Sequence, residues 1–220
     1  MTNTKTEKVL KIVIIILSIL LFALVFQFGN FMLKKYQAKN KTSPLSIKPT
    51  PQVWAHAGYK KGVPGNSILA FKKAFEHGAK GIELDSHFDS NLFKFVISHN
   101  YPYQTHDGKL LYLEEVFKKI GKSGYYWLDL KNLSEDNIDD ITTRLKYLLN
   151  RYDLKRSVFV ESWHWKEISE LSHRDIQTIY WIGLKHPPGS FDHFEELYMT
   201  RKWIAKSNFY AISGHKVYGP

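Results

Sequence analysis

The sequence predicts an α/β protein, a TIM-barrel-like (β/α) barrel preceded by one transmembrane helix. Short segments rich in β-branched and aromatic residues alternate with segments of helical periodicity, and a long apolar stretch precedes them. Repeated strand-helix units imply a parallel sheet, and seven strands favour a barrel over a small open sheet. A doubly wound open sheet is the alternative. Because the pattern ends after a seventh strand, we expect a barrel that is open or incomplete at its C-terminus.

Seven segments have the composition and flanking residues of strands. They are residues 53–56, 81–85, 94–99, 125–131, 157–163, 178–184 and 209–213. Three segments carry apolar residues at helical spacing, residues 67–77, 111–120 and 138–152. These elements alternate along most of the chain, as a parallel barrel requires.

The N-terminal region predicts a membrane anchor. Every residue from 12 to 26 except Ser18 is apolar, and the apolar character continues to Leu33, which supplies about the twenty residues that a spanning helix needs. A cleaved signal peptide is the alternative, but no small-x-small cleavage site follows the apolar run. We assign residues 1–35 to the anchor, 36–52 to a polar linker with three prolines, and 53–220 to one catalytic domain.

Two signals disagree on the orientation of this anchor. Four lysines follow the span closely and three precede it, which favours a cytoplasmic domain by the positive-inside rule. The short N-terminal tail is typical of a signal anchor and favours export. We expect a single-pass membrane protein with its catalytic domain on the extracytoplasmic side.

Net charge and cysteine content limit the classes of binding partner and the kinds of metal ligand that the chain can have. With 31 Lys plus Arg against 21 Asp plus Glu, the formal charge is +10, which favours anionic partners such as phospholipid headgroups or nucleic acid. The lysines are spread along the chain without a basic block, so nucleic-acid binding is not expected. The absence of cysteine excludes thiolate metal sites and leaves Asp, Glu and His as ligands. The oligomeric state stays open.

Ionisable residues mark the ends of the first four predicted strands. His56 ends the first strand, Glu83 and Asp85 the second, His99 the third, and Asp129 and Lys131 the fourth. In a parallel barrel the C-terminal ends of the strands face one side, so we expect these side chains to converge there.

The carboxylates in this set indicate a divalent metal. Glu83 and Asp85 are two positions apart on a strand and share a face, where they repel unless a cation or a proton lies between them. With Asp129 they offer three oxygen ligands, which suits Mg²⁺ or Ca²⁺ better than Zn²⁺. For the Glu-x-Asp pair taken alone, a solvated strand end is the alternative.

The remaining members fit phosphoryl transfer. His56 and His99 flank the carboxylates, so one can take a proton from the attacking oxygen while the other gives one to the leaving oxygen. Lys131 offers a positive charge to the phosphate, and a metal ion would neutralise developing charge. The residues therefore predict a metal-dependent site for phosphoryl transfer.

Four segments together resemble the glycerophosphodiester phosphodiesterase family. They are Trp-Ala-His-Ala-Gly at 54–58, Pro-Gly-Asn-Ser at 64–67, Gly-Ala-Lys-Gly-Ile-Glu-Leu-Asp at 78–85 and Ile-Ser-His-Asn at 97–100. The resemblance implies a TIM-barrel-like fold, a bound divalent metal, and cleavage of a phosphodiester with a glycerol-type or lysophospholipid headgroup.

The resemblance also assigns roles to single residues. It makes His56 and His99 the acid/base pair and Glu83 and Asp85 metal ligands. It places Asp129 where the family usually has a third ligand, glutamate, and Lys131 matches the lysine that follows.

Two departures from the family pattern bear on substrate handling. Ala57 stands where the family has an arginine, and Gly65 stands where it has a glutamate. The Asp-Leu-Lys motif at 129–131 is also similar, more faintly, to sphingomyelinase D-type phospholipases, which often attack with an internal hydroxyl. A catalytically impaired relative that binds lipid headgroups or phosphodiesters is the alternative to an enzyme.

The fifth predicted strand carries two further candidates for the substrate site. Glu161 is a polar residue near the strand end, and Trp163 follows at its last position. Glu161 is a candidate polar contact, and Trp163 is a candidate cover for a headgroup or acyl chain. Packing in the core or at the rim is the alternative for the tryptophan.

Overall fold

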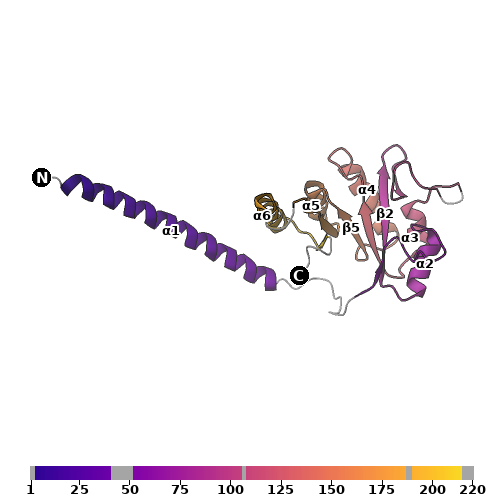
Figure 1. Cartoon of the computed structure of the whole chain (residues 1–220). Helices are drawn as coiled ribbons and strands as arrows, with labels where there is room; N and C mark the ends of the chain where they lie inside the picture. The colour runs from indigo at the N-terminus through magenta and orange to yellow at the C-terminus, as the bar shows by residue number, and fades with distance from the viewer. Residues whose placement is uncertain (1–2, 41–51, 106–107, 187–189, 215–220) are drawn as a thin grey trace. The chain divides into compact units, whose positions relative to one another are not determined.

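The computed structural model of the chain describes residues 3–40, 52–105, 108–186 and 190–214 (Figure 1). Contacts divide the chain into two compact units, Met1–Pro49 and Thr50–Pro220. The first unit carries the predicted anchor, and the second carries the predicted site.

The described residues of the first unit form one long helix, α1 (Asn3–Asn40). Its segment Glu7–Leu33 has a mean hydropathy of 3.2 and is, among the described residues, the one helix long and apolar enough to cross a membrane. A helix that is apolar all round needs an apolar environment on every side. The helix ends within the segment predicted as a linker, and residues 41–51 of that segment lie outside the described residues.

The second unit is a curled sheet covered by helices. Its strands are β1 (Trp54–Ala55), β2 (Gly81–Asp89), β3 (Lys94–Ile97), β4 (Tyr125–Leu130), β5 (Val158–Ser162), β6 (Thr178–Ile182) and β7 (Ala211–Gly214). Six of them run parallel in the order β1-β2-β4-β5-β6-β7. This arrangement is a partial TIM barrel and confirms the predicted fold class.

In the described part of this unit, five helices accompany these strands. They are α2 (Ile68–Glu76), α3 (Leu113–Ile120), α4 (Ile138–Arg151), α5 (Trp165–His173) and α6 (Phe191–Lys206). The first three match the predicted segments, whereas α5 and α6 were not predicted. In α5 the short apolar pattern is limited to Ile168 and Leu171, which are buried. In α6 the helix starts at a Ser190 cap whose hydroxyl accepts from the His193 N–H at 3.1 Å.

Strand β3 corrects the expectation that all of the strands are parallel. It pairs antiparallel with the end of β2, with Ser86 opposite Ile97 and Asp89 opposite Lys94. The predicted second strand ended too early, because β2 continues to Asp89 and leaves only residues 90–93 before β3. A parallel connection needs about a dozen residues or more, whereas a short loop permits only a hairpin.

The two faces of the sheet have different surroundings. In β4, Tyr126, Leu128 and Leu130 are fully buried and belong to the main hydrophobic core. The alternate positions point to the inner, concave face, where Trp54 of β1 lies with its ring 6.1 Å from that of Phe159 on β5. Two strands separate β1 from β5 in the sheet, so this contact requires the sheet to curl as a barrel wall does.

The Leu84→Ala variant tests this division of the sheet. Leu84 is completely buried on β2, so the truncation leaves a cavity and should lower the free energy of unfolding by about 2–5 kcal/mol. Leu92→Ala is the matched control, because Leu92 is 46% exposed and its loss should cost less than about 0.5 kcal/mol. Urea unfolding of the full chain in detergent, followed by tryptophan fluorescence, measures both. Equal losses in the two variants would contradict the assignment of Leu84 to the core.

Candidate active site

Carboxylates form a row across three neighbouring strands on the inner face. The parallel register places Asp85 of β2 beside Asp129 of β4, and Asp129 beside Glu161 of β5. Glu83 shares the face of Asp85 because it lies two positions earlier in the same strand. The sheet therefore gathers acidic residues that are far apart in the sequence.

Three of these residues lie close enough to hold one cation. One carboxylate oxygen from each of Glu83, Asp85 and Asp129 lies within 4.8 Å of the others. The structure thus brings together the three residues predicted as metal ligands. All of the donors are carboxylate oxygens, the chemistry that Mg²⁺ and Ca²⁺ prefer.

Lys131 lies between two of these carboxylates. Its Nζ is 2.7 Å from Asp85 Oδ1 and 2.5 Å from Asp129 Oδ2. Burial alone would lower the pKa of Lys131, but the hydrogen bonds to Asp129 and Asp85 outweigh it and raise that pKa. The cluster therefore already accommodates one positive charge at its edge.

Asn66 fixes the orientation of Asp85. Its side-chain N–H donates to Asp85 Oδ2 at 2.7 Å, and its Oδ1 accepts from the Asp85 backbone N–H at 3.2 Å. Burial would raise the pKa of Asp85, but the bonds from Lys131 and Asn66 lower it below its usual value. The sequence analysis gave Asn66 no role, although it belongs to the second family-like segment.

Glu83 has the opposite electrostatic environment. Its Oε2 accepts the Ala57 backbone N–H at 2.8 Å. Burial, together with the nearby charge of Asp85, raises its pKa to about 8. Two carboxylates in one buried space cannot both ionise without a compensating cation, so Glu83 retains a proton unless a cation binds. This behaviour fits a divalent-metal site.

The first of the two predicted histidines lies beside this cluster. His56 follows β1 directly and places its Nε2 4.0 Å from Glu83 Oε2. Its Nδ1 lies 3.3 Å from the Lys60 Nζ, a neighbour that the sequence analysis did not identify. The imidazole is exposed and can reach a bound substrate.

The second histidine reaches the site by a different route from the one expected. His99 follows the antiparallel β3, and the Ser98 N–H donates to the Asp85 carbonyl at 3.1 Å. The hairpin thus returns His99 to the level of Asp85. Its Nδ1 donates to Asn100 Oδ1 at 2.8 Å, which leaves Nε2 free to accept a proton.

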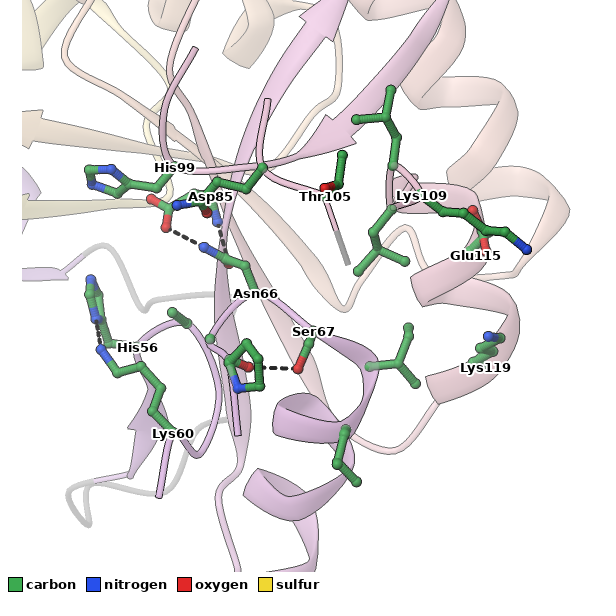
Figure 2. A pocket seen from close by; sticks show the side chains of 18 residues that line it. His56, Lys60, Asn66, Ser67, Asp85, His99, Thr105, Lys109, Glu115 and Lys119 are labelled. Atoms are coloured by element: carbon green, nitrogen blue, oxygen red, sulfur yellow. Dashed lines mark hydrogen bonds between the residues drawn. The ribbon is translucent and has the colours of Figure 1, made fainter. Parts of the chain in front are cut away.

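Two cavities divide the predicted residues between them, except for Glu83, which lines neither. The larger, of about 1010 Å³, is lined by His56, Asp85, His99 and residues of the loop before α2, which Figure 2 shows around a common space. The smaller, of about 260 Å³, is lined by Asp129, Lys131, Glu161, Trp163, Leu130 and Trp181. The ion pairs of Lys131 connect the two cavities.

Glu161 and Trp163 both lie at the smaller cavity. Glu161 is buried, accepts a hydrogen bond from Ser213 Oγ, and has its pKa raised to about 7, mainly by burial. Trp163 is 61% exposed, so it lies at the rim of the cavity and not in the core.

The raised pKa of Glu83 has a measurable consequence for stability. Without added metal, the free energy of unfolding should fall as pH rises from about 5 to 8, because the folded state keeps a proton that the unfolded chain releases. Glu161 contributes with the same sign. Glu83→Gln should reduce this slope and leave the part that Glu161 contributes, whereas Glu76→Gln, a change at an exposed residue of α2, should preserve the whole slope. Denaturant unfolding at several pH values with chelator measures the slope, and a wild-type stability that rises over this interval would refute the assignment.

No family model matches the chain. One curated protein, the glycerophosphodiester phosphodiesterase domain-containing protein 4 of Macaca fascicularis, is 35% identical over 52 residues. That match covers 24% of this chain and spans only 8% of the length of the relative. The sequence similarity is therefore local.

Several solved structures share the architecture of the chain. A glycerophosphodiester phosphodiesterase from Parabacteroides distasonis has a TM-score of 0.52 and 18% identity, covering 74% of this chain and 92% of that one. The enzyme from Thermotoga maritima has a TM-score of 0.51 and 20% identity, covering 70% and 72%.

A phosphodiesterase from Oleispira antarctica, solved with the product sn-glycerol-3-phosphate, has a TM-score of 0.52 and 15% identity, covering 74% of this chain and 92% of that one. At these identities the similarities establish the fold. The resemblance to glycerophosphodiester phosphodiesterases that the sequence motifs indicated is thus confirmed at the level of architecture.

Proposed function

We propose that the chain is a membrane-anchored, metal-dependent phosphodiesterase that cleaves glycerophosphodiesters or lysophospholipids. The observation that carries this proposal is the cluster of three carboxylates beside His56, together with a cavity that both histidines and Asp85 of the cluster line, in a fold shared with glycerophosphodiester phosphodiesterases.

In this proposal Glu83, Asp85 and Asp129 hold Mg²⁺ or Ca²⁺. The all-oxygen donor set and the proton that Glu83 retains in the absence of a cation support this assignment. When bound, such an ion would act as a Lewis acid for a phosphoryl oxygen. Asn66 would keep Asp85 oriented both with and without a bound cation.

His56 and His99 are the proposed acid/base pair. Both line the larger cavity with Asp85, so a phosphodiester in that space lies within reach of both. The hydrogen bond from His99 Nδ1 to Asn100 leaves Nε2 as a proton acceptor, which suits the removal of a proton from the attacking oxygen. His56 would then serve the leaving oxygen.

The smaller cavity is the proposed site for those phosphate oxygens that face away from the histidines, and for the headgroup or acyl chain attached to the phosphate. Lys131 would offer positive charge, Glu161 a polar contact, and the exposed Trp163 an apolar cover for a headgroup or acyl chain. The α1 helix would keep the domain near lipid-derived substrates. We assign the catalytic domain to the extracytoplasmic side.

The alternative is a binding module without efficient turnover. It is favoured by Ala57 and Gly65, which replace an arginine and a glutamate of the family pattern. Such a protein would keep the metal cluster and bind phosphodiesters or lipid headgroups without cleaving them.

Phosphorus NMR of the full chain in detergent micelles separates these two functions. With glycerophosphodiesters and lysophospholipids, we expect products that form with Mg²⁺ or Ca²⁺ and disappear with chelator. His56→Ala and His99→Ala should each lower the rate by about 10²–10⁴-fold, the usual contribution of a general acid or base. A cyclic phosphate product would select attack by an internal hydroxyl over attack by water.

His173→Ala is the control for the histidine variants, because His173 lies at the exposed end of α5. It should keep the wild-type rate. Glu83→Gln should remove both the activity and its dependence on metal. A well-folded wild-type protein that cleaves no substrate would leave the binding module as the function.

Membrane orientation has its own test. A cysteine introduced at the exposed position Lys61 should react in intact cells with a membrane-impermeant maleimide, because the chain has no native cysteine. Labelling only after the cells are permeabilised would place the domain on the cytoplasmic side.

A further inference from the structure

Lys60 lies at the proposed site, yet neither the metal cluster nor the acid/base pair accounts for it. Its Nζ lies 3.3 Å from His56 Nδ1, a contact drawn in Figure 2, and its side chain lines the larger cavity. We propose that Lys60 positions His56 and supplies the ammonium that binds the phosphodiester anion in this cavity. This inference rests on the proposed function. Lys60 would supply the positive charge that is missing because Ala57 stands in place of the family's arginine.

Two small residues make room for this lysine. A Cβ placed on Gly65 would lie 3.0 Å from Lys60 Cδ and 3.2 Å from the Ala57 Cβ. The methylene stem of Lys60 therefore passes closely over Gly65, next to Ala57. These are the two positions at which the sequence departs from the family pattern. Larger side chains there would compete with the stem for the same space.

The loop holds Lys60 beside His56 through backbone contacts. The Gly58 N–H donates to the Ala55 carbonyl at 3.0 Å, and the Tyr59 N–H donates to the Ala70 carbonyl at 3.0 Å. Gly58 has a φ of +79°, and a Cβ there would collide with Ala70. The chain thus turns back sharply after β1 and anchors on the start of α2, which returns Lys60 to His56.

The charges of the site leave Lys60 available to an anion. Lys131 already pairs with both Asp85 and Asp129, so much of its charge is compensated. Within the described part of the chain, Lys60 forms no ion pair with a carboxylate. An exposed ammonium next to the proposed acid/base residue can therefore meet a phosphoryl oxygen by a small rotation of its side chain.

The contact also determines which nitrogen of His56 carries the proton. An ammonium can only donate, so Nδ1 must accept and the proton of the neutral imidazole resides on Nε2. This nitrogen faces Glu83 Oε2 at 4.0 Å. His99 has the opposite arrangement, because its Nδ1 donates to Asn100. Before a substrate binds, the two histidines thus present one hydrogen-bond donor and one hydrogen-bond acceptor to the cavity. When Lys60 rotates to a phosphoryl oxygen, Nδ1 of His56 becomes available for the second proton that this histidine needs in order to act as a general acid.

The test combines affinity with a spectroscopic measurement on the full chain in detergent micelles. Isothermal calorimetry with sn-glycerol 3-phosphate should show about a tenfold loss of affinity in Lys60→Met, the order expected for one charge-assisted hydrogen bond. Lys60→Arg should retain most of the affinity. In ¹⁵N NMR, His56 of the wild type should show the Nε2–H tautomer, and Lys60→Met should lose this preference.

Two further variants sharpen the result. Lys61→Met is the matched control, since it removes the neighbouring exposed lysine and should change neither measurement. Gly65→Ala keeps Lys60 but crowds its stem, so it should weaken binding by a smaller factor. For phosphodiesters that are cleaved, Lys60→Met should raise KM more than it lowers kcat.

The proposal is overturned if Lys60→Met binds sn-glycerol 3-phosphate as the wild type does and keeps the His56 tautomer. It is also overturned if Lys61→Met loses as much affinity as Lys60→Met. A wild type that binds this ligand through Lys60 but turns over no phosphodiester would refute the proposed catalysis and still support the role of Lys60.

Discussion

The ion pairs of Lys131 with Asp85 and Asp129 are the interaction on which the candidate site depends. The sheet register forces carboxylates of adjacent strands into one small space, where like charges repel. Lys131 and Asn66 lower the pKa of Asp85, whereas at Glu83 burial and the charge of Asp85 outweigh the hydrogen bond from Ala57 and raise the pKa to about 8. With all three carboxylates ionised and Lys131 charged, the cluster would carry a net charge of −2, which a divalent cation would neutralise.

The curl of the sheet places an aromatic layer on one side of this cluster and two cavities next to it. At the level of Glu83 in the strand register, two positions before Asp85, the ring of Trp54 lies 5.8 Å from that of Trp127 and 6.1 Å from that of Phe159. This aromatic layer fills the inner face on one side of the acidic row. The histidines open on one cavity, and Lys131 with Glu161 opens on the other. A substrate that occupies both cavities would lie over Asp85 and Asp129, which line one cavity each.

The loop between β1 and α2 changes how the departures from the family pattern are interpreted. Ala57 and Gly65 alone suggest a loss of function, because both are small and neither carries a charge. The packing shows that the freed space is occupied by the stem of Lys60. A site can therefore keep a cation near its histidine although the cation comes from another position in the chain.

The sequence alone determined the parallel strand-helix architecture, the apolar helix and the polar residues at the strand ends. Alternation and helical periodicity are local, so a single strand such as β4 already shows that Asp129 faces away from Leu128 and Leu130. The direction of β3, the pairing of Lys131, and the contacts of Asn66 and Lys60 became known only from the tertiary structure. They depend on loop paths and on the register between strands, which bring together residues whose separation in sequence carries no periodic signal.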